Sequence, residues 1–180
     1  MTATASNTKY YLKLTLTLFV LAAVVALCLG LVNSITAEPI QQHKEETARN
    51  AMSQVLAADT YEEVPFTDAT GTVQAVYKAG QAGYVVDLSV SGSQGMIELM
   101  VGVDVNGVVT GVSIVDHSET SGLGANCVKE SFRSQFIGTS GGLAVNKDGG
   151  TIDALTGATI TSRAVTNAVN TAVACVAGLR

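Results

Sequence analysis

The sequence contains few cysteines, and their positions exclude a disulfide framework. Its 180 residues include three, Cys28, Cys127 and Cys175, and Cys28 lies inside a long apolar run. At most one pair remains for the rest of the chain, which is too few for a small fold held by disulfides. The chain must therefore rely on an apolar core, and the residues beyond Val32 are numerous enough for one such domain.

Motifs for metal binding are also lacking. The sequence has two histidines and no HExxH, CxxC or carboxylate cluster, so no metal site is predicted. His117 and Cys127 lie ten residues apart and suggest a thiol nucleophile with its base, although no family signature surrounds them. A hydrolase that uses this pair is one alternative for the function.

Positive charge is scarce in most of the chain. Beyond Val32 there are 8 basic and 15 acidic residues, a formal net charge of −7. Because nucleic-acid binding depends on the neutralisation of phosphates by Lys and Arg, an acidic domain argues against a nucleic-acid partner.

Charge is absent altogether from Leu14–Val32, a run of 19 residues rich in Leu and Val. At a rise of about 1.5 Å per residue, this length fits one membrane crossing. Lys9 and Lys13 precede the run, which places residues 1–13 in the cytoplasm and the rest of the chain outside it. We therefore predict a single transmembrane helix over residues 14–32 and a location in the cell membrane.

Two other interpretations of this run remain. A cleaved signal peptide has a shorter apolar core, of about 7–15 residues, that ends at a small-x-small site, and here Ile35 occupies the position where a small residue is preferred. A pilin-like structural protein also combines an apolar N-terminal helix with a small α+β head. It requires a glutamate early in that helix, and Leu14–Val32 contains none.

Residues 33–71 predict a juxtamembrane helix and a connection. Pro39 suits the first turn of this second helix, and Ala48, Met52 and Val55 continue one apolar stripe at helical spacing. The polar residues 57–71 are expected to form a loop.

Residues 72–180 predict one domain of α+β class. About four antiparallel strands are expected over residues 72–116, with a hairpin turn at Asn106-Gly107, where both positions would need a positive φ. A short helix is expected over residues 125–138, with Val128, Phe132 and Phe136 on one face. A final helix over residues 161–177 is expected to pack against the sheet through the following residues: Val165, Val169, Ala172, Val173 and Val176.

The stretch "DALTGATITS" stands at the start of this final helix. A helix N-terminus carries free N–H groups and stabilises anions, and Gly157 allows the backbone to approach a ligand closely. The hydroxyls of Thr156, Thr159, Thr161 and Ser162 add donors or attachment points. The stretch predicts either a phosphate-binding site or an ordinary Ser/Thr cap after a glycine turn.

A second candidate is "DHSETSGLGANC", between the last strand and the short helix. Gly122 and Gly124 flank Leu123, which places an apolar side chain on an open backbone and suits contact with a flat ring. An ordinary loop would have the same composition. The dinucleotide fingerprint is excluded, since it requires glycine where Cys127 stands.

Both stretches resemble motifs of one family. "DALTGATITS" resembles the flavinylation motif of FMN-binding subunits in ion-pumping redox complexes, Asp-x-x-Ser/Thr-Gly-Ala-Thr, and "DHSETSGLG" is similar to their H-x-E-T-P-G-L-G loop. The order of the predicted elements resembles the G subunit of the Rnf complex over residues 9–178. The C subunit of the Na⁺-translocating NADH:quinone reductase is similar but generally longer, and it is the alternative together with other extracytoplasmic FMN-binding electron carriers.

The resemblance implies a role for each matching residue. Thr159 would hold FMN through a phosphoester bond, with Thr156, Gly157 and Ala158 completing the motif and Asp153 as its first residue. Glu119, Thr120, Gly122 and Leu123 would belong to the loop beside the flavin, in which Ser121 replaces the proline usual in the family.

The resemblance also implies a function. The chain would be a membrane-anchored flavoprotein that relays electrons in an ion-translocating ferredoxin:NAD⁺ oxidoreductase, without an independent catalytic activity. Its partners would be the other membrane subunits of the complex and a flavin transferase that uses FAD and Mg²⁺.

Overall fold

The computed structural model, which describes residues 3–66, 68 and 70–179, begins with one long helix, α1 (Ala3–Val55). The side chains of Leu14–Val32 are exposed around the whole helix. Among the described residues, this is the one helix that is long and apolar enough to cross a membrane, by length and composition. The Thr17 hydroxyl donates to the Lys13 carbonyl at 2.8 Å, so this polar group is satisfied within the helix.

The predicted start of a second helix at Pro39 is wrong, because Pro39 lies inside α1. Proline has no N–H to donate to the carbonyl of Ile35, one turn earlier. Both residues are exposed, so this carbonyl is free to bond to solvent. The helix therefore loses one backbone hydrogen bond without ending.

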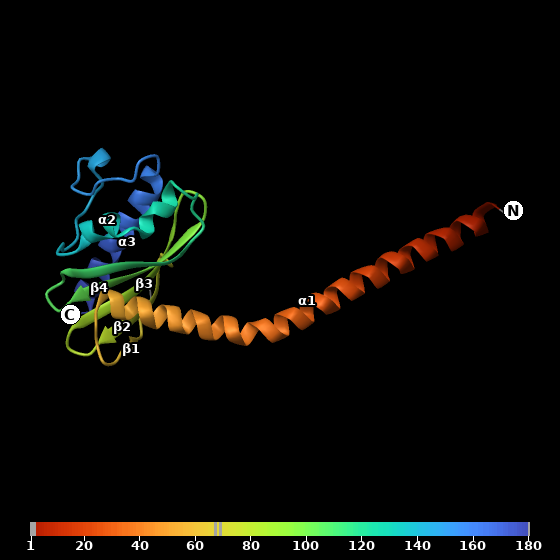
Figure 1. Cartoon of the computed structure of the whole chain (residues 1–180), viewed down its shortest axis with the longest axis horizontal. Helices are drawn as coiled ribbons and strands as arrows, with labels where there is room; N and C mark the ends of the chain where they lie inside the picture. The colour runs from red at the N-terminus through yellow and green to blue at the C-terminus, as the bar shows by residue number, and fades with distance from the viewer. Residues whose placement is uncertain (1–2, 67, 69, 180) are drawn as a thin grey trace. The chain divides into compact units, whose positions relative to one another are not determined.

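Contacts divide the chain into two compact units, Met1–Glu46 and Thr47–Arg180, and the strands lie in the second unit. It contains one antiparallel sheet in the order β1-β2-β3-β4-β5, in which every strand pairs with the next (Figure 1). The α+β prediction is confirmed. The strands are β1 (Glu62–Val64), β2 (Val73–Ala79), β3 (Gly83–Ser91), β4 (Met96–Asp104) and β5 (Val109–His117). β1 was not predicted, because it is a three-residue edge strand within a polar stretch.

The hairpin between β4 and β5 lies where it was predicted, but its turn differs. In this turn, Gly107 has a positive φ of 84° and Asn106 does not, since every positive φ among the described residues belongs to a glycine. The Asp104 carboxylate instead organises the turn, since its Oδ1 accepts hydrogen bonds from the N–H groups of Asn106 and Val108, each at 2.8 Å. This side-chain turn removes the need for a left-handed Asn106.

One face of the sheet is covered by α3 (Thr159–Gly178), as Figure 1 shows. The predicted apolar stripe of this helix is confirmed, except that Val173 is only partly buried. Its buried side chains pack against Val86, Leu88, Leu99 and Val101 of the central strands. The helix begins two residues earlier than predicted, at Thr159, which makes Thr159 its first residue.

The segment predicted as one short helix is broken. It consists of the 3-10 turn η1 (Gly124–Val128), the single-turn helix α2 (Glu130–Arg133) and the 3-10 turn η2 (Ser134–Phe136). Lys129 has an extended conformation between the first two, which changes the helical register. Phe132 and Phe136 are buried, in edge-to-face contact with 5.4 Å between the ring centroids. Val128, which was expected on the same face, is instead 42% exposed.

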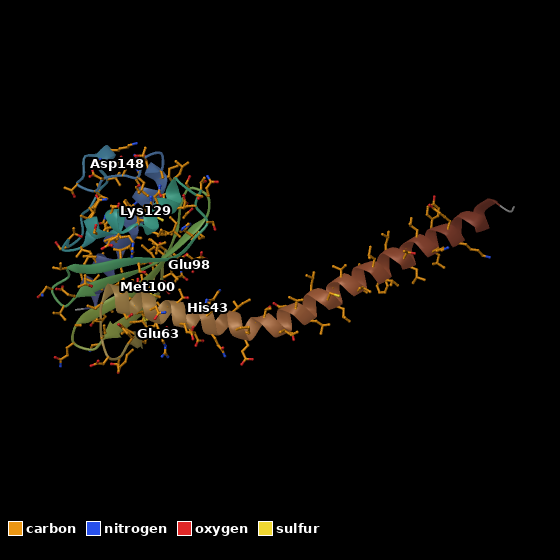
Figure 2. All side chains as sticks on the ribbon, viewed as in Figure 1. His43, Glu63, Glu98, Met100, Lys129 and Asp148 are labelled. Atoms are coloured by element: carbon orange, nitrogen blue, oxygen red, sulfur yellow. The ribbon has the colours of Figure 1, made fainter. Side chains whose placement is uncertain are left out.

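The opposite face of the sheet is covered in part by the end of α1. Met52 and Val55 pack against Met100 of β4, and Met100 is labelled in Figure 2. Gly102 and Gly111 pair across β4 and β5 beneath Val55, and a Cβ at Gly111 would lie 2.8 Å from the Val55 Cα. The glycine pair therefore lets the last helical turn approach the sheet backbone.

A half-buried carboxyl on this second face makes stability depend on pH. Burial, followed by repulsion from Glu98, raises the pKa of Asp87 from 3.8 to about 6. The folded chain therefore binds more protons than the unfolded chain between these values, and stability falls as the pH rises through this window. Asp87→Asn should raise the midpoint of thermal unfolding by roughly 3–8 °C at pH 7.5, and by much less at pH 4.5.

Circular dichroism of the full chain in detergent measures both midpoints. Asp59→Asn, at an exposed position, is the matched control and should change neither. An equal gain from Asp87→Asn at both pH values would contradict the assigned ionisation.

Candidate functional site

The two motifs singled out in the sequence meet at the N-terminus of α3. The Thr161 hydroxyl donates to Oε2 of Glu119 at 2.7 Å. Leu123 lies against Gly157, where an added Cβ would be 3.0 Å from the Leu123 Cδ2. The loop after β5 and the first turn of α3 therefore form one surface, as the predicted flavin site requires.

Glu119 also connects this surface to the β3–β4 turn. Its Oε1 accepts hydrogen bonds from the N–H groups of Ser93 at 2.7 Å and Gln94 at 3.1 Å. The side chain is nearly buried, with 9% of the residue exposed. One carboxylate therefore holds three segments that are far apart in the sequence.

Two glycines make room for this carboxylate. A Cβ at Gly92 would collide with Oε1 of Glu119, and a Cβ at Gly124 would collide with Oε2. Gly124 belongs to the predicted loop, whereas Gly92 follows β3 and was not singled out. Nothing in the local sequence around Gly92 indicates a contact with a residue 27 positions away, so only the folded structure identifies it.

The environment of Glu119 favours its ionised form. Burial alone would raise its pKa, but the hydrogen bonds from Thr161, Gln94 and Ser93 and the neighbouring His117 together outweigh burial and lower the pKa below 4.5. The stabilisation from this carboxylate is therefore present above its ordinary pKa and is lost as the pH falls through the lowered value.

Thr159 is half-buried at the first position of α3. Its hydroxyl oxygen accepts a hydrogen bond from Nζ of Lys147 at 3.1 Å. Gly157 turns the chain with a φ of 73°, and the N-cap residue Ala158 makes no side-chain capping bond. The N-terminal end of α3 and the Lys147 ammonium together supply positive charge next to the Thr159 oxygen.

Thr161 and Ser162 are buried, and their hydroxyls are bonded within the chain. The Ser162 hydroxyl donates to the Ala158 carbonyl and accepts from the Leu155 N–H, each at 2.9 Å. Among the described residues, no buried side-chain nitrogen or oxygen lacks a hydrogen-bond partner. These two residues shape the turn before α3, and their direct contact with a flavin stays a prediction.

Thr156, Thr120 and Gly122 are exposed on the same two segments. The Thr120 carbonyl accepts from the N–H of Leu123 at 3.1 Å, and Gly122 has a φ of 80°. This turn leaves Leu123 45% exposed beside the start of α3. A flavin contact for Thr156, Thr120 and Gly122 remains a prediction.

Lys147 lies on the 3-10 turn η3 (Asn146–Asp148), which was not predicted from the sequence. Asp148 accepts two hydrogen bonds from the Arg163 guanidinium, each at 2.6 Å. Arg163 projects from the second turn of α3, so this ion pair ties η3 to the helix. Asp148, in Figure 2, lies at the end of the domain opposite Glu63 of β1.

His117 and Cys127 do not form a nucleophilic pair. The Cys127 thiol is fully buried, and burial followed by the charge of Glu119 raises its pKa to about 11. A reactive cysteine needs a lowered pKa and access to solvent. His117 instead accepts the Glu119 N–H at its Nδ1, which helps to fix the loop.

The chain is similar to several known proteins. Residues 92–174 match the FMN-binding domain family. The G subunit of the ion-translocating oxidoreductase complex of Methanosarcina acetivorans is 35% identical, with 93% of this chain and 95% of the relative covered. The chain belongs to this G-subunit family.

Two further relatives have similar coverage. The G subunit of the Na⁺-translocating ferredoxin:NAD⁺ oxidoreductase complex of Acetobacterium woodii is 36% identical, covering 90% of this chain and 89% of the relative. The proton-translocating counterpart of Clostridium ljungdahlii is 38% identical, covering 89% and 86%. The C subunit of the Na⁺-translocating NADH-quinone reductase of Parabacteroides distasonis has a solved structure that matches with a TM-score of 0.47 and 26% identity, covering 65% of this chain and 71% of that one.

Membership of the G-subunit family confirms the resemblance that the two motifs indicated. Both motifs fall within the matched residues 92–174, so the FMN-binding domain contains the whole junction around Glu119. FMN is confirmed as the cofactor of this domain, and the pilin-like and hydrolase interpretations are set aside.

Glu119 should be essential for the integrity of this junction. Glu119→Ala removes three hydrogen bonds to a charged acceptor and leaves the N–H groups of Ser93 and Gln94 without a partner, so the domain should lose roughly 2–5 kcal/mol of stability. Urea unfolding of the full chain in detergent measures the loss. Gly124→Ala should also destabilise, because its methyl group displaces the carboxylate.

Glu130→Ala is the matched control, since Glu130 is an exposed carboxylate on α2. It should leave the midpoint within experimental error of the wild type. Equal small effects from Glu119→Ala and Glu130→Ala would show that the junction does not depend on Glu119.

Proposed function

We propose that the chain is a membrane-anchored electron carrier with FMN attached covalently to Thr159, within an Rnf-type ferredoxin:NAD⁺ oxidoreductase complex. The observation that carries the proposal is the position of Thr159, at the start of α3 within the FMN-binding domain, with Lys147 at 3.1 Å from its hydroxyl. The G-subunit relatives are covered over 86–95% of their length, which favours this complex over the quinone reductase.

The residues around Thr159 fit a phosphodiester. A phosphoester bond needs an accessible oxygen, and the Thr159 side chain is half-buried rather than enclosed. The phosphodiester would carry one negative charge, and the free N–H groups at the start of α3 stabilise an anion there by about 0.3–1 kcal/mol. Gly157 and Ala158 add little side-chain volume beside this oxygen.

The loop after β5 supplies the surface for the flavin ring. Leu123, which is 45% exposed, and Ile160, which is 58% exposed, come from the two motifs and present apolar area at the same end of the domain. Contact with an aromatic ring would remove that area from water. The bound flavin accepts and passes on electrons, while Glu119 keeps the loop fixed against α3.

The proposed orientation places the N-terminus in the cytoplasm and the FMN domain outside it. Lys9 and Lys13 precede the apolar run of α1, and short positively charged segments remain on the cytoplasmic side. A covalent bond suits that location, because released flavin would be lost. The partners are the other membrane subunits of the complex and a flavin transferase that loads Thr159.

Covalent FMN should depend on the Thr159 hydroxyl. The full chain expressed together with a flavin transferase should give a band that fluoresces under ultraviolet light after denaturing electrophoresis. Its intact mass should increase by that of FMN less one water. Thr159→Ala should abolish both signals, because the acceptor oxygen is gone, whereas Thr156→Ala should retain at least partial labelling.

Thr159→Ser, which keeps the oxygen, is the matched control for Thr159→Ala and should still be labelled. A fluorescent band that persists in Thr159→Ala would place the attachment elsewhere. A wild-type chain without the added mass would refute covalent attachment altogether.

The orientation can be tested by thiol labelling. Gln81→Cys places a thiol at an exposed turn between β2 and β3, whereas Cys127 and Cys175 are buried. A membrane-impermeant maleimide should label this variant in spheroplasts before lysis. Labelling that appears only after lysis would reverse the proposed orientation, and the wild-type chain measures the background from the native cysteines.

A further inference from the structure

We propose that Lys147 is the positioning residue for flavin attachment: it orients the Thr159 hydroxyl before loading and pairs with the phosphodiester afterwards. This inference rests on the proposed function. Its basis is the 3.1 Å hydrogen bond from the Lys147 ammonium to the Thr159 oxygen, which joins two residues twelve positions apart. None of the sequence motifs includes Lys147.

The turn that carries Lys147 is anchored on both sides. On one side, the Asn146 side chain donates to the Asp153 carboxylate at 3.0 Å and accepts from the Ala154 N–H at 3.4 Å. On the other side, Asp148 forms its two bonds to Arg163. Asp153 is the first residue of the attachment motif and Arg163 follows its last residue, so the turn is bonded on both sides of Thr159.

The backbone of the turn is also constrained. The Asn146 N–H donates to the Ile152 carbonyl at 2.7 Å, and the Gly150 N–H donates to the Val145 carbonyl at 3.0 Å. Lys147 therefore stands at the tip of a closed loop whose ends are bonded to each other. An exposed lysine usually loses much conformational entropy on forming a contact. Here the backbone that carries Lys147 is already fixed close to the Thr159 oxygen, so less of this entropy remains to be lost.

The loading reaction gives this contact a chemical role. The Thr159 oxygen bonds to the phosphorus of the FMN half of FAD, the pyrophosphate bond breaks, AMP leaves, and the hydroxyl proton is transferred to the released phosphate through solvent or the transferase. Because the ammonium occupies one lone pair of the oxygen, the hydroxyl is oriented with its remaining electron pair exposed. A β-branched side chain has few rotamers, so this orientation selects one of them.

After loading, the same ammonium neutralises the product. The phosphorus is bonded directly to the Thr159 oxygen that Lys147 already contacts. The non-bridging phosphate oxygens would therefore lie within reach of the Lys147 ammonium. Charge-assisted hydrogen bonds of this kind are stronger than neutral ones. Asp148 does not compete for the ammonium, because both of its oxygens are engaged by Arg163.

The rate of loading tests the proposal. Purified full-length chain without flavin is mixed in detergent with the transferase, FAD and Mg²⁺, and the gain in intact mass is followed with time. Lys147→Met keeps the length and removes the charge, and should slow loading about tenfold. Lys147→Arg should restore most of the rate, and Asp148→Asn, which weakens the anchor alone, should be intermediate.

Lys129→Met is the matched control, since Lys129 is an exposed lysine at the start of α2, outside the motifs. It should load at the wild-type rate. The variants of both lysines should keep the wild-type thermal unfolding midpoint before loading, because Lys129 and Lys147 are exposed. The phosphorus NMR signal of the loaded chain should shift in Lys147→Met and respond to salt only when Lys147 is present.

Three outcomes would overturn the inference. These are loading of Lys147→Met at the rate of Lys129→Met, an unchanged phosphorus signal, and a slow Lys147→Met that also unfolds earlier and is not rescued by arginine. A wild-type chain that takes up no flavin would refute the proposed function itself, and is thus distinguishable from a failure of the role of Lys147 alone.

Discussion

The site depends on one buried carboxylate, that of Glu119. Its two oxygens accept hydrogen bonds from the β3–β4 turn and from the first turn of α3, while its own backbone belongs to the loop after β5. All three segments lie at the ends of regular elements, where sheet and helix bonds do not hold them. Glu119 therefore gives the loop that bears Leu123 and the helix that bears Thr159 a common reference point.

The rest of the fold supports this junction from below. The body of α3 is buried against the central strands, so the helix cannot shift without disrupting the core. Thr159 stands half-buried at the first position of this helix, at the end of the buried stripe. A reactive position is thus combined with a rigid support, while the end of α1 packs on the other face of the sheet and leaves this surface open.

The sequence predicts those parts of the structure that depend on residue type in a local pattern. The α3 stripe and the strands from β2 to β5 belong to this class. The break at Lys129 and the negative φ of Asn106 were not predicted. The conformation of Lys129 depends on the neighbouring backbone, and that of Asn106 depends on the Asp104 carboxylate. The roles of Gly92 and Lys147 could not be predicted for a further reason. Gly92 contacts Glu119 and Lys147 contacts Thr159, and only the fold brings these residues close together.

The pairing of every buried side-chain nitrogen and oxygen among the described residues has a consequence for biogenesis. No buried polar side chain of the domain therefore depends on FMN for its hydrogen bond. Under the proposed attachment, folding and maturation are separate events, and the acceptor is presented on a finished surface. Copies without flavin would then be stable and would not be removed as misfolded chains. The flavin supply would therefore set the fraction of assemblies able to conduct electrons.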